Sequence, residues 1–154
     1  MTTSMKTHMQ IALLLLTPLT LFAQRPGTTQ WTATAQATSS AGEYVVTLHG
    51  AVEKGWHVYS TKQADGGPLP LAIRVDQGAP FALNGSLSGT QPTKHHDASF
   101  NLDTEFFTDT FVVNVPVKGT ANTKGDVPLS VRFQMCSDTT CMPPRTVHLI
   151  AKIS

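Results

Sequence analysis

Apolar and polar residues alternate with a period of two along several stretches of the chain. Successive side chains of a strand point to opposite faces, so this alternation predicts strands with one buried and one solvated face. No stretch shows a convincing apolar period of 3.6, which would predict an amphipathic helix. The clearest alternating stretches are residues 43–49, 111–117, 127–135 and 147–153.

Turn-forming residues separate these stretches at short intervals, as in Asp65-Gly66-Gly67-Pro68 and Asn84-Gly85. Many short strands joined by such turns are typical of a β-sandwich. We predict an all-β, immunoglobulin-like antiparallel β-sandwich of about eight or nine strands. The least strand-like stretch, residues 89–105, is polar, and we expect it to be a long functional loop around the isolated Phe100.

The N-terminal segment has the pattern of a secretory signal peptide. Lys6 precedes an apolar run over residues 11–22, and Ala23 is the small residue at the expected cleavage site. The run is shorter than the roughly 20 residues that a spanning helix needs, and Pro18 interrupts it. We therefore expect residues 1–23 to be removed, and the remaining chain to be periplasmic or secreted without a membrane span.

The remaining chain has the length of one domain. We expect residues 24–30 to form a flexible lead-in and residues 31–154 to form the sandwich. Without Lys6, the basic residues fall from 11 to 10, against 10 acidic residues, so the net charge is zero with histidine neutral. A neutral chain argues against a nucleic-acid partner, because phosphate binding needs a basic excess. We expect a monomer that needs no cofactor and holds no metal.

Both cysteines of the chain, Cys136 and Cys141, stand near its C-terminal end. Cys136 follows the strand predicted over 127–135, and Cys141 precedes the strand predicted over 147–153. If these strands form a hairpin, the cysteines face each other across its mouth, where a disulfide is geometrically reasonable. An exported chain also meets conditions in which disulfides form.

The cysteine pair is open to three interpretations. A structural disulfide across so short a loop would add about 2 kcal/mol in the chain-entropy model, against ~4.7 kcal/mol for a 100-residue loop. A redox pair needs two close sulfurs that exist in both states, which this spacing provides. A Cu(I) carrier could use the sulfur atoms of Met135, Cys136, Cys141 and Met142, although no Met-rich run or zinc-ligand spacing accompanies them. Redox activity is favoured, and the other two interpretations stay open.

The residues around the cysteines resemble the active-site hairpin of the N-terminal periplasmic domain family of DsbD, the thiol:disulfide interchange protein (disulfide bond corrector domain). The motif that carries the resemblance is Phe133-Gln134-Met135-Cys136 followed by Cys141-Met142-Pro143-Pro144. The stretch from Val52 to Ser60 resembles the family's early strand, in which a Gly and an aromatic residue precede a Tyr. The resemblance extends over about residues 30–154.

The resemblance implies a thiol–disulfide relay with Cys136 and Cys141 as the redox pair. Electrons would pass between a membrane DsbD-type or thioredoxin-like reductant and periplasmic thiol oxidoreductases. The family also implies a cap loop with an aromatic residue, here Phe100, that shields the pair until a partner docks. Whether the chain is itself an enzyme of the protein-disulfide reductase type stays open. The residues expected around the pair are Phe100, His57, Tyr59, Pro143 and Pro144.

The chain departs from the family pattern in three ways. The Cys-x4-Cys spacing is one residue shorter than in the best-known members. Ala98 and Ser99 stand where the best-known cap has acidic residues, so the cap is left without a charge at these two positions. The sequence also shows no membrane or thioredoxin-like domain, so we expect separate partners. The two alternatives are a non-catalytic secreted binding module with a structural disulfide and, less favoured, the Cu(I) carrier.

Overall fold

The structure is a computed structural model that describes residues 27–120, 123 and 125–153. All regular elements in these residues are strands, which confirms the predicted all-β class. The described residues form twelve strands, and four of these (β3, β5, β6 and β11) have only two or three residues, too few for an alternation to show. The strands are β1 (Thr29–Ala37), β2 (Glu43–Val52), β3 (His57–Tyr59), β4 (Ala72–Val75), β5 (Phe81–Leu83), β6 (Ser88–Gly89), β7 (Thr93–Asp97), β8 (Leu102–Phe107), β9 (Thr110–Gly119), β10 (Val127–Phe133), β11 (Met135–Cys136) and β12 (Arg145–Ile153).

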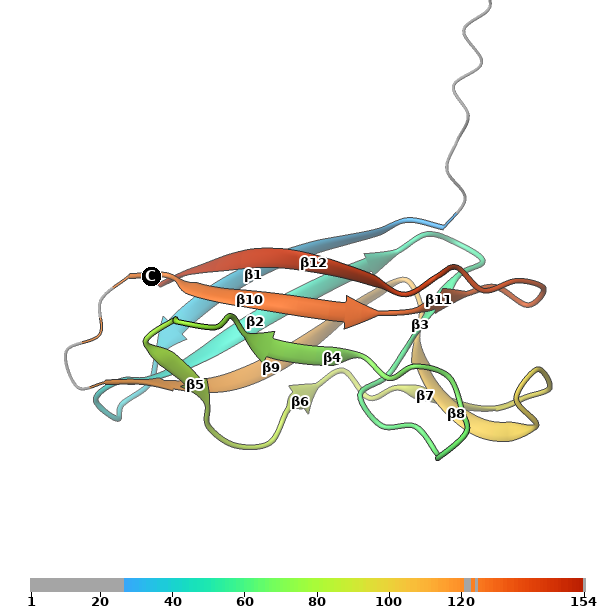
Figure 1. Ribbon diagram of the computed structural model, residues 1–154, viewed down its shortest axis with the longest axis horizontal. Coiled ribbons are helices and arrows are strands. Elements are labelled where there is room, and N and C mark those ends of the chain that lie inside the picture. The colour runs from blue at the N-terminus through green and yellow to red at the C-terminus, as the bar shows by residue number, and fades with distance from the viewer. Residues whose placement is uncertain (1–26, 121–122, 124, 154) are drawn as a thin grey trace, which may run out of the picture.

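The strands are arranged in a large and a small sheet (Figure 1). The large sheet has the order β4-β10-β12-β1-β2-β9-β5, with β6 also paired to β9, and the small sheet has the order β11-β3-β8-β7. Between β12 and β1 the pairing is parallel and short, Thr34 with Lys152 and Ala35 with Ile153. This pairing joins the two halves of the large sheet, β4-β10-β12 and β1-β2-β9-β5. The other pairings among the described strands are antiparallel, which confirms the predicted immunoglobulin-like antiparallel sandwich.

One apolar core lies between the two halves of the large sheet. β2 and β9 bury alternate residues toward it, and β10 does the same from the opposite half. These are the apolar positions of the alternating stretches, so the predicted strands and their inward faces are confirmed. The buried residues of this core include Val46, Leu48, Val113, Val115, Val117, Val127, Leu129 and Val131.

An aromatic cluster connects this core to the small sheet. The Trp31 ring contacts Phe111 edge-on at a centroid distance of 5.4 Å and Phe133 at 5.2 Å. Phe111 in turn stacks on Phe107 of β8, with ring centroids 4.3 Å apart and planes within 6°. Because Phe107 belongs to the small sheet, this stack sets the position of that sheet against the sandwich.

Residues 89–105 do not form the long loop that we expected. β7 and β8 pair antiparallel, from Thr93 with Phe106 to Asp97 with Leu102, and only residues 98–101 form the turn between them. All five residues of β7 are polar (TKHHD) because this strand is the exposed edge of the small sheet. An edge strand without a buried face shows no apolar alternation, and charged side chains protect it from pairing with other chains.

The flexible lead-in expected over residues 24–30 also differs from the structure at its end. β1 begins at Thr29, and Gly27 is buried beside the Trp56 ring. The Glu53 carboxylate accepts a hydrogen bond from the Thr28 N–H at 2.9 Å, which ties the start of the chain to the turn before β3. The expected signal peptide, residues 1–23, lies outside the described residues. In the part of the chain that the structure describes, no helix has the length and apolar character to cross a membrane.

Candidate redox site

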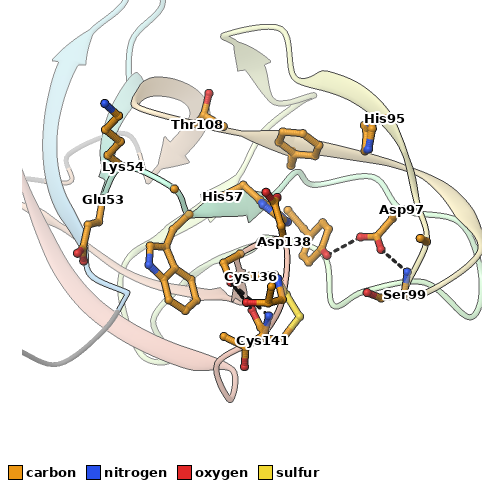
Figure 2. Close-up of a pocket in the computed structure, with 18 of the residues that line it drawn as sticks. Glu53, Lys54, His57, His95, Asp97, Ser99, Thr108, Cys136, Asp138 and Cys141 are labelled. Atoms are coloured by element: carbon orange, nitrogen blue, oxygen red, sulfur yellow. Dashed lines mark hydrogen bonds between the residues drawn. A yellow bond between two sulfur atoms is a disulfide. The ribbon is translucent and has the colours of Figure 1, made fainter.

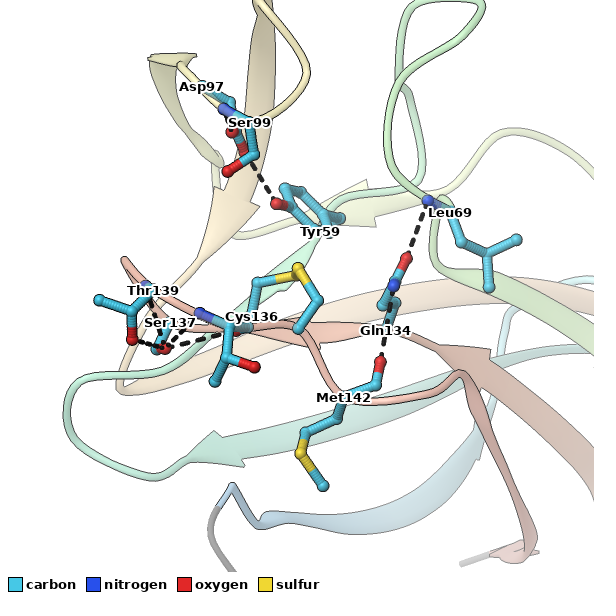
Figure 3. Close-up of a disulfide and its surroundings, with 11 residues drawn as sticks. Tyr59, Leu69, Asp97, Ser99, Gln134, Cys136, Ser137, Thr139 and Met142 are labelled. Atoms are coloured by element: carbon cyan, nitrogen blue, oxygen red, sulfur yellow. Dashed lines mark hydrogen bonds between the residues drawn. A yellow bond between two sulfur atoms is a disulfide. The ribbon is translucent and has the colours of Figure 1, made fainter.

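The two cysteines form a disulfide at the mouth of a hairpin, as the strand pattern predicted (Figure 3). β10 and β12 pair antiparallel up to Phe133 and Arg145. The chain continues from β10 through β11, turns over residues 137–140 and returns at Cys141, which forms an isolated bridge with Cys136. The Cα atoms of the two cysteines lie 4.0 Å apart, closer than the roughly 5.5 Å typical of disulfides.

Ser137 braces the turn between the cysteines. Its backbone N–H donates to the Thr140 carbonyl at 2.8 Å. Its Oγ accepts hydrogen bonds from the backbone N–H groups of Thr139 at 3.4 Å and Thr140 at 3.2 Å. Such bonds hold a short turn locally, so we expect the hairpin tip to keep its shape when the disulfide opens.

Gln134 joins the base of this hairpin to the loop before β4. Its Oε1 accepts a hydrogen bond from the Leu69 N–H at 3.2 Å, and its Nε2 donates to the Met142 carbonyl at 3.5 Å (Figure 3). A side-chain amide can make both bonds because it carries an acceptor and a donor. The sequence placed Gln134 in the motif without a function. The structure shows that it positions the residue after Cys141.

The two cysteines differ in their access to solvent. Cys136 is 1 % exposed, whereas Cys141 lies at the surface. Thiol–disulfide exchange requires a thiolate to reach one sulfur atom of the disulfide, and access decides which sulfur is attacked. The geometry therefore makes Cys141 the sulfur that an incoming thiolate can reach.

A groove of about 630 Å³ opens beside the disulfide (Figure 2). Its walls come from the turn before β3, from β3 itself, from the β7–β8 hairpin and from residues 136–141. Four residues that the sequence placed at or around the site line this groove together: Cys136, Cys141, His57 and Tyr59. The groove is thus the place where a docking partner would meet the reactive sulfur.

β3 is the direct neighbour of the redox hairpin in the small sheet. In the β3–β11 pairing, His57 lies opposite Cys136, and Val58 lies opposite Met135. Residues that are directly opposite on antiparallel strands point to the same face, with Cβ atoms about 4.5–5.5 Å apart. The two side chains that face the groove from this pair are therefore an imidazole and a sulfur of the disulfide.

Aromatic rings surround His57 on the groove wall. Its ring centroid lies 5.0 Å from that of Tyr59 and 4.7 Å from that of Phe106. Phe106 and Trp56, which were not among the residues expected around the redox pair, also line the groove. The signal for Phe106 was its neighbour Phe107, because adjacent strand residues point to opposite faces and only one of the two can enter the core.

The sequence profile of the family described as "Thiol:disulfide interchange protein DsbD, N-terminal" matches residues 27–151. The chain belongs to this family. No curated protein matches the chain by sequence. Within the part of the chain that the structure describes, no three His, Cys, Asp or Glu side chains are grouped so that they could hold a metal ion.

Solved structures with a similar fold include the following three. The N-terminal domain of DsbD from Neisseria meningitidis in the reduced form is 14% identical, with a TM-score of 0.53 over 79% of this chain and 84% of that chain. The N-terminal periplasmic domain of ScsB from Proteus mirabilis is 17% identical, with a TM-score of 0.55 over 80% of this chain and 48% of that chain. A complex between the DsbD N-terminal and PilB N-terminal domains from Neisseria meningitidis gives 12% identity and a TM-score of 0.51 over 78% and 80%.

The remaining residues expected around the redox pair do not line the groove. Phe100 is half-buried in the turn between β7 and β8, and its ring meets Tyr59 edge-on at 6.2 Å. Pro143 and Pro144 are exposed on the return to β12. Because proline has no N–H to donate, this pair interrupts strand pairing between Cys141 and β12.

Asp97 fastens the turn between β7 and β8 to β3. Its Oδ2 accepts a hydrogen bond from the Tyr59 hydroxyl at 2.8 Å, and its Oδ1 accepts one from the Ser99 N–H at 2.9 Å (Figure 2). An acidic group is therefore present at this turn, one position before Ala98. The resemblance pointed only to positions 98 and 99, so Asp97 was not among the expected residues.

The electrostatics of this contact follow from burial and hydrogen bonding. Burial raises the pKa of Asp97, but the hydrogen bonds from Tyr59 and from the backbone of Ser99 and Phe100, with help from His57, outweigh it and hold this pKa below its ordinary value. Burial and the bond to Asp97 raise the pKa of Tyr59 above its ordinary value. The pair is thus a phenol donor and a carboxylate acceptor at neutral pH.

Tyr59→Phe is expected to loosen the turn between β7 and β8. Hydrogen bonds to a charged group are typically worth about 1.5–3 kcal/mol, so amide hydrogens of residues 97–101 should exchange with solvent roughly tenfold or more faster. Hydrogen exchange read by mass spectrometry measures this. The matched control is Tyr44→Phe, which removes the other tyrosine hydroxyl, bonded to the Thr123 carbonyl at 3.4 Å. Equal exchange of residues 97–101 in all three proteins would contradict the prediction.

Proposed function

We propose that this chain is a periplasmic relay domain that passes reducing equivalents through the Cys136–Cys141 pair. Its electrons would come from a membrane or thioredoxin-like reductant and go to periplasmic thiol oxidoreductases. The observation that carries the proposal is a disulfide with one buried and one exposed cysteine, on the wall of a groove, in a member of the DsbD N-terminal family. A relay needs one sulfur that partners can reach and a second that completes the exchange.

Reduction of the domain would begin at Cys141. A partner thiolate attacks the Cys141 sulfur and forms an intermolecular disulfide, while the Cys136 sulfur leaves as a thiolate and takes up a proton. A second thiolate of the partner then attacks the partner's own sulfur in this mixed disulfide, which releases Cys141 as a thiolate. The domain has gained two electrons and the partner has become a disulfide.

Transfer to an acceptor would run through the same sulfur. The Cys141 thiolate attacks one sulfur of the acceptor disulfide, and a mixed disulfide forms as the acceptor's other sulfur leaves as a thiolate. Cys136 then attacks the Cys141 sulfur, the intramolecular disulfide forms again, and the acceptor leaves with its second sulfur reduced. Because each step needs only the exposed Cys141 at the surface, donor and acceptor would use the same docking face in turn.

The lining of the groove is acidic. With histidine neutral, four carboxylates among the described residues (Glu53, Asp97, Asp109 and Asp138) line it against one cation, Lys54, and Figure 2 shows Lys54 beside Glu53 on one wall. A field with one dominant sign favours a partner that carries the opposite charge on its docking face. A complex of similar fold, between DsbD and PilB domains, supports the idea that such a domain binds another redox domain directly.

The test of the proposal is equilibration of the protein in glutathione redox buffers, with the cysteine state read by alkylation and mass spectrometry. We expect both the dithiol and the disulfide to be populated within the range of redox potentials that glutathione buffers set. Structural disulfides typically have potentials below about −300 mV. A Cys136–Cys141 pair that stays oxidised in buffers more reducing than that would overturn the relay, and would favour the binding module with a structural disulfide.

The two alternatives are not favoured. A non-catalytic binding module would not require an exposed sulfur beside a groove, and the DsbD N-terminal family points to exchange. A Cu(I) carrier would draw on Met135 and Met142. Met135, however, is buried and accepts a hydrogen bond from the Thr29 hydroxyl at its sulfur. Thiol–disulfide exchange is therefore the function that the site supports best.

A further inference from the structure

His57 holds a buried ring nitrogen without a hydrogen-bond partner. Its Nε2 atom is inaccessible to solvent, and no donor or acceptor among the described residues bonds to it. Buried polar atoms nearly always have a partner, so such an exception needs a physical reason. The ring is held in place by Tyr59 and Phe106, which leaves it little freedom to turn toward water.

The reason lies across the strand pair. Cys136 is directly opposite His57, both line the groove, and Cys136 is only 1 % exposed. In the disulfide, the Cys136 sulfur carries no proton, so it cannot donate a hydrogen bond to Nε2 of the imidazole opposite it. Reduction places a thiol at the same position, and this thiol must lose its proton before it can attack, although water has little access to it.

We propose that His57 is the acid–base partner of Cys136 in the relay. In the resolving step, Nε2 of the neutral imidazole accepts the Cys136 thiol proton. The Cys136 thiolate attacks the Cys141 sulfur of the mixed disulfide, the Cys136–Cys141 bond forms, and the partner sulfur leaves as a thiolate. In the opposite direction, the imidazolium returns the proton to Cys136 as its sulfur leaves. This proposal rests on the relay function.

The surroundings of His57 suit a base that becomes protonated only briefly. Burial lowers the pKa of His57 most, and His95 of β7 lowers it further, whereas Asp97 of β7 and Asp138 of the hairpin turn raise it. The net pKa lies below the ordinary value, so the ring is neutral near pH 7 and can accept a proton. Asp97 and Asp138 would then stabilise the imidazolium. The other titratable groups on the groove are Tyr59, which stays protonated, and Glu53, Lys54, His96 and Asp109.

A small aromatic disulfide, 5,5′-dithiobis(2-nitrobenzoate), separates the resolving step from the first attack. When the reduced protein is mixed with this probe in a stopped-flow instrument, Cys141 releases one thionitrobenzoate and Cys136 then displaces the second. General acid–base catalysis typically raises a rate by 10²–10⁴-fold. Thiols need the least activation by a base, because a few per cent of them are already ionised at pH 7. We therefore expect His57→Phe and His57→Gln to slow the second release about 10²-fold and to leave the first within about twofold.

The pH profile distinguishes an acid–base role from a structural one. In the wild type, the rate of the second release should fall at low pH as His57 becomes protonated, and it should stay level near neutral pH. In both variants, this rate should instead rise about tenfold per pH unit until the Cys136 thiol ionises. The matched control is the same pair of substitutions at His49, an exposed histidine of β2 away from the redox groove.

The outcomes that would overturn the proposal are distinct from failure of the relay. A second release with wild-type rate and pH profile in both His57 variants would overturn it, and so would a slower release with an unchanged profile. A first release at the wild-type rate, together with a wild-type circular-dichroism spectrum, shows that a variant is folded with Cys141 accessible. If the wild type itself released only one equivalent, Cys136 would not resolve mixed disulfides, and the relay function would fail.

Discussion

Cys136→Ser is expected to trap the protein on its partners, whereas Cys141→Ser is expected to leave it nearly inert. Cys141 is exposed and can form a mixed disulfide, but without Cys136 nothing resolves it. In Cys141→Ser, the remaining thiol is at the 1 % exposed position 136, and a reagent reaches it only after local opening. Opening that costs about 3 kcal/mol would slow the reaction about 100-fold.

Reaction with glutathione disulfide measures this difference. The Cys136→Ser protein should gain one glutathione per chain, seen as an adduct by mass spectrometry under native conditions. The Cys141→Ser protein should react about 100-fold more slowly until denaturant is added. The two variants control for each other because each keeps one thiol and lacks the disulfide. Equal rates, or faster reaction at position 136, would contradict the assignment of Cys141 as the sulfur that partners attack.

Gly50→Ala is expected to destabilise the fold strongly, although alanine is otherwise better than glycine in a strand. Gly50 lies opposite Phe111 in the β2–β9 pairing, and a Cβ atom there would overlap two atoms of the Phe111 ring. The ring cannot move aside, because it packs between Trp31 and Phe107. The entropic gain of about 0.5–1 kcal/mol is smaller than the cost of overpacking, about 1–3 kcal/mol.

Urea unfolding with the disulfide intact measures the free energy of unfolding of Gly50→Ala. A double-mutant cycle with Phe111→Leu tests the cause, because the smaller side chain gives the new methyl group room. Phe111→Leu alone should destabilise the protein, and the double variant should be more stable than the sum of the single effects predicts, by about 0.5–3 kcal/mol. Additive effects, or a Gly50→Ala protein as stable as the wild type, would contradict the prediction.

The sequence predicted those parts of the fold in which a strand has one buried face. β2, β9, β10 and β12 were found because each buries alternate residues, and the hairpin of β10 and β12 then brought Cys136 and Cys141 together. The prediction of strands from alternation failed at β7, because this polar edge strand has no buried face and so shows no alternation of apolar and polar residues. Residues 89–105 therefore looked like a loop although most of them lie in paired strands.

The candidate site was only partly visible in the sequence. The motif identified the cysteines, and the resemblance to the DsbD N-terminal family pointed to His57, Tyr59 and Phe100. Asp97 escaped notice because its function depends on the Tyr59 hydroxyl, which reaches it from a different strand. Gln134 was recognised as part of the motif, but its bonds to Leu69 and Met142 depend on a loop remote in the sequence.

The sequence by itself determined the all-β class, the core faces of the long strands and the local disulfide, because all three follow from side chains that are close together along the chain. Only the tertiary structure decided which cysteine is exposed and that His57 faces Cys136. Both depend on β3 pairing with β11 in one register, and a slip of one residue would turn His57 to the other face. Phe107 of β8, which lies opposite Val58 of β3, stacks on Phe111 of β9, and no local pattern records this contact between distant strands.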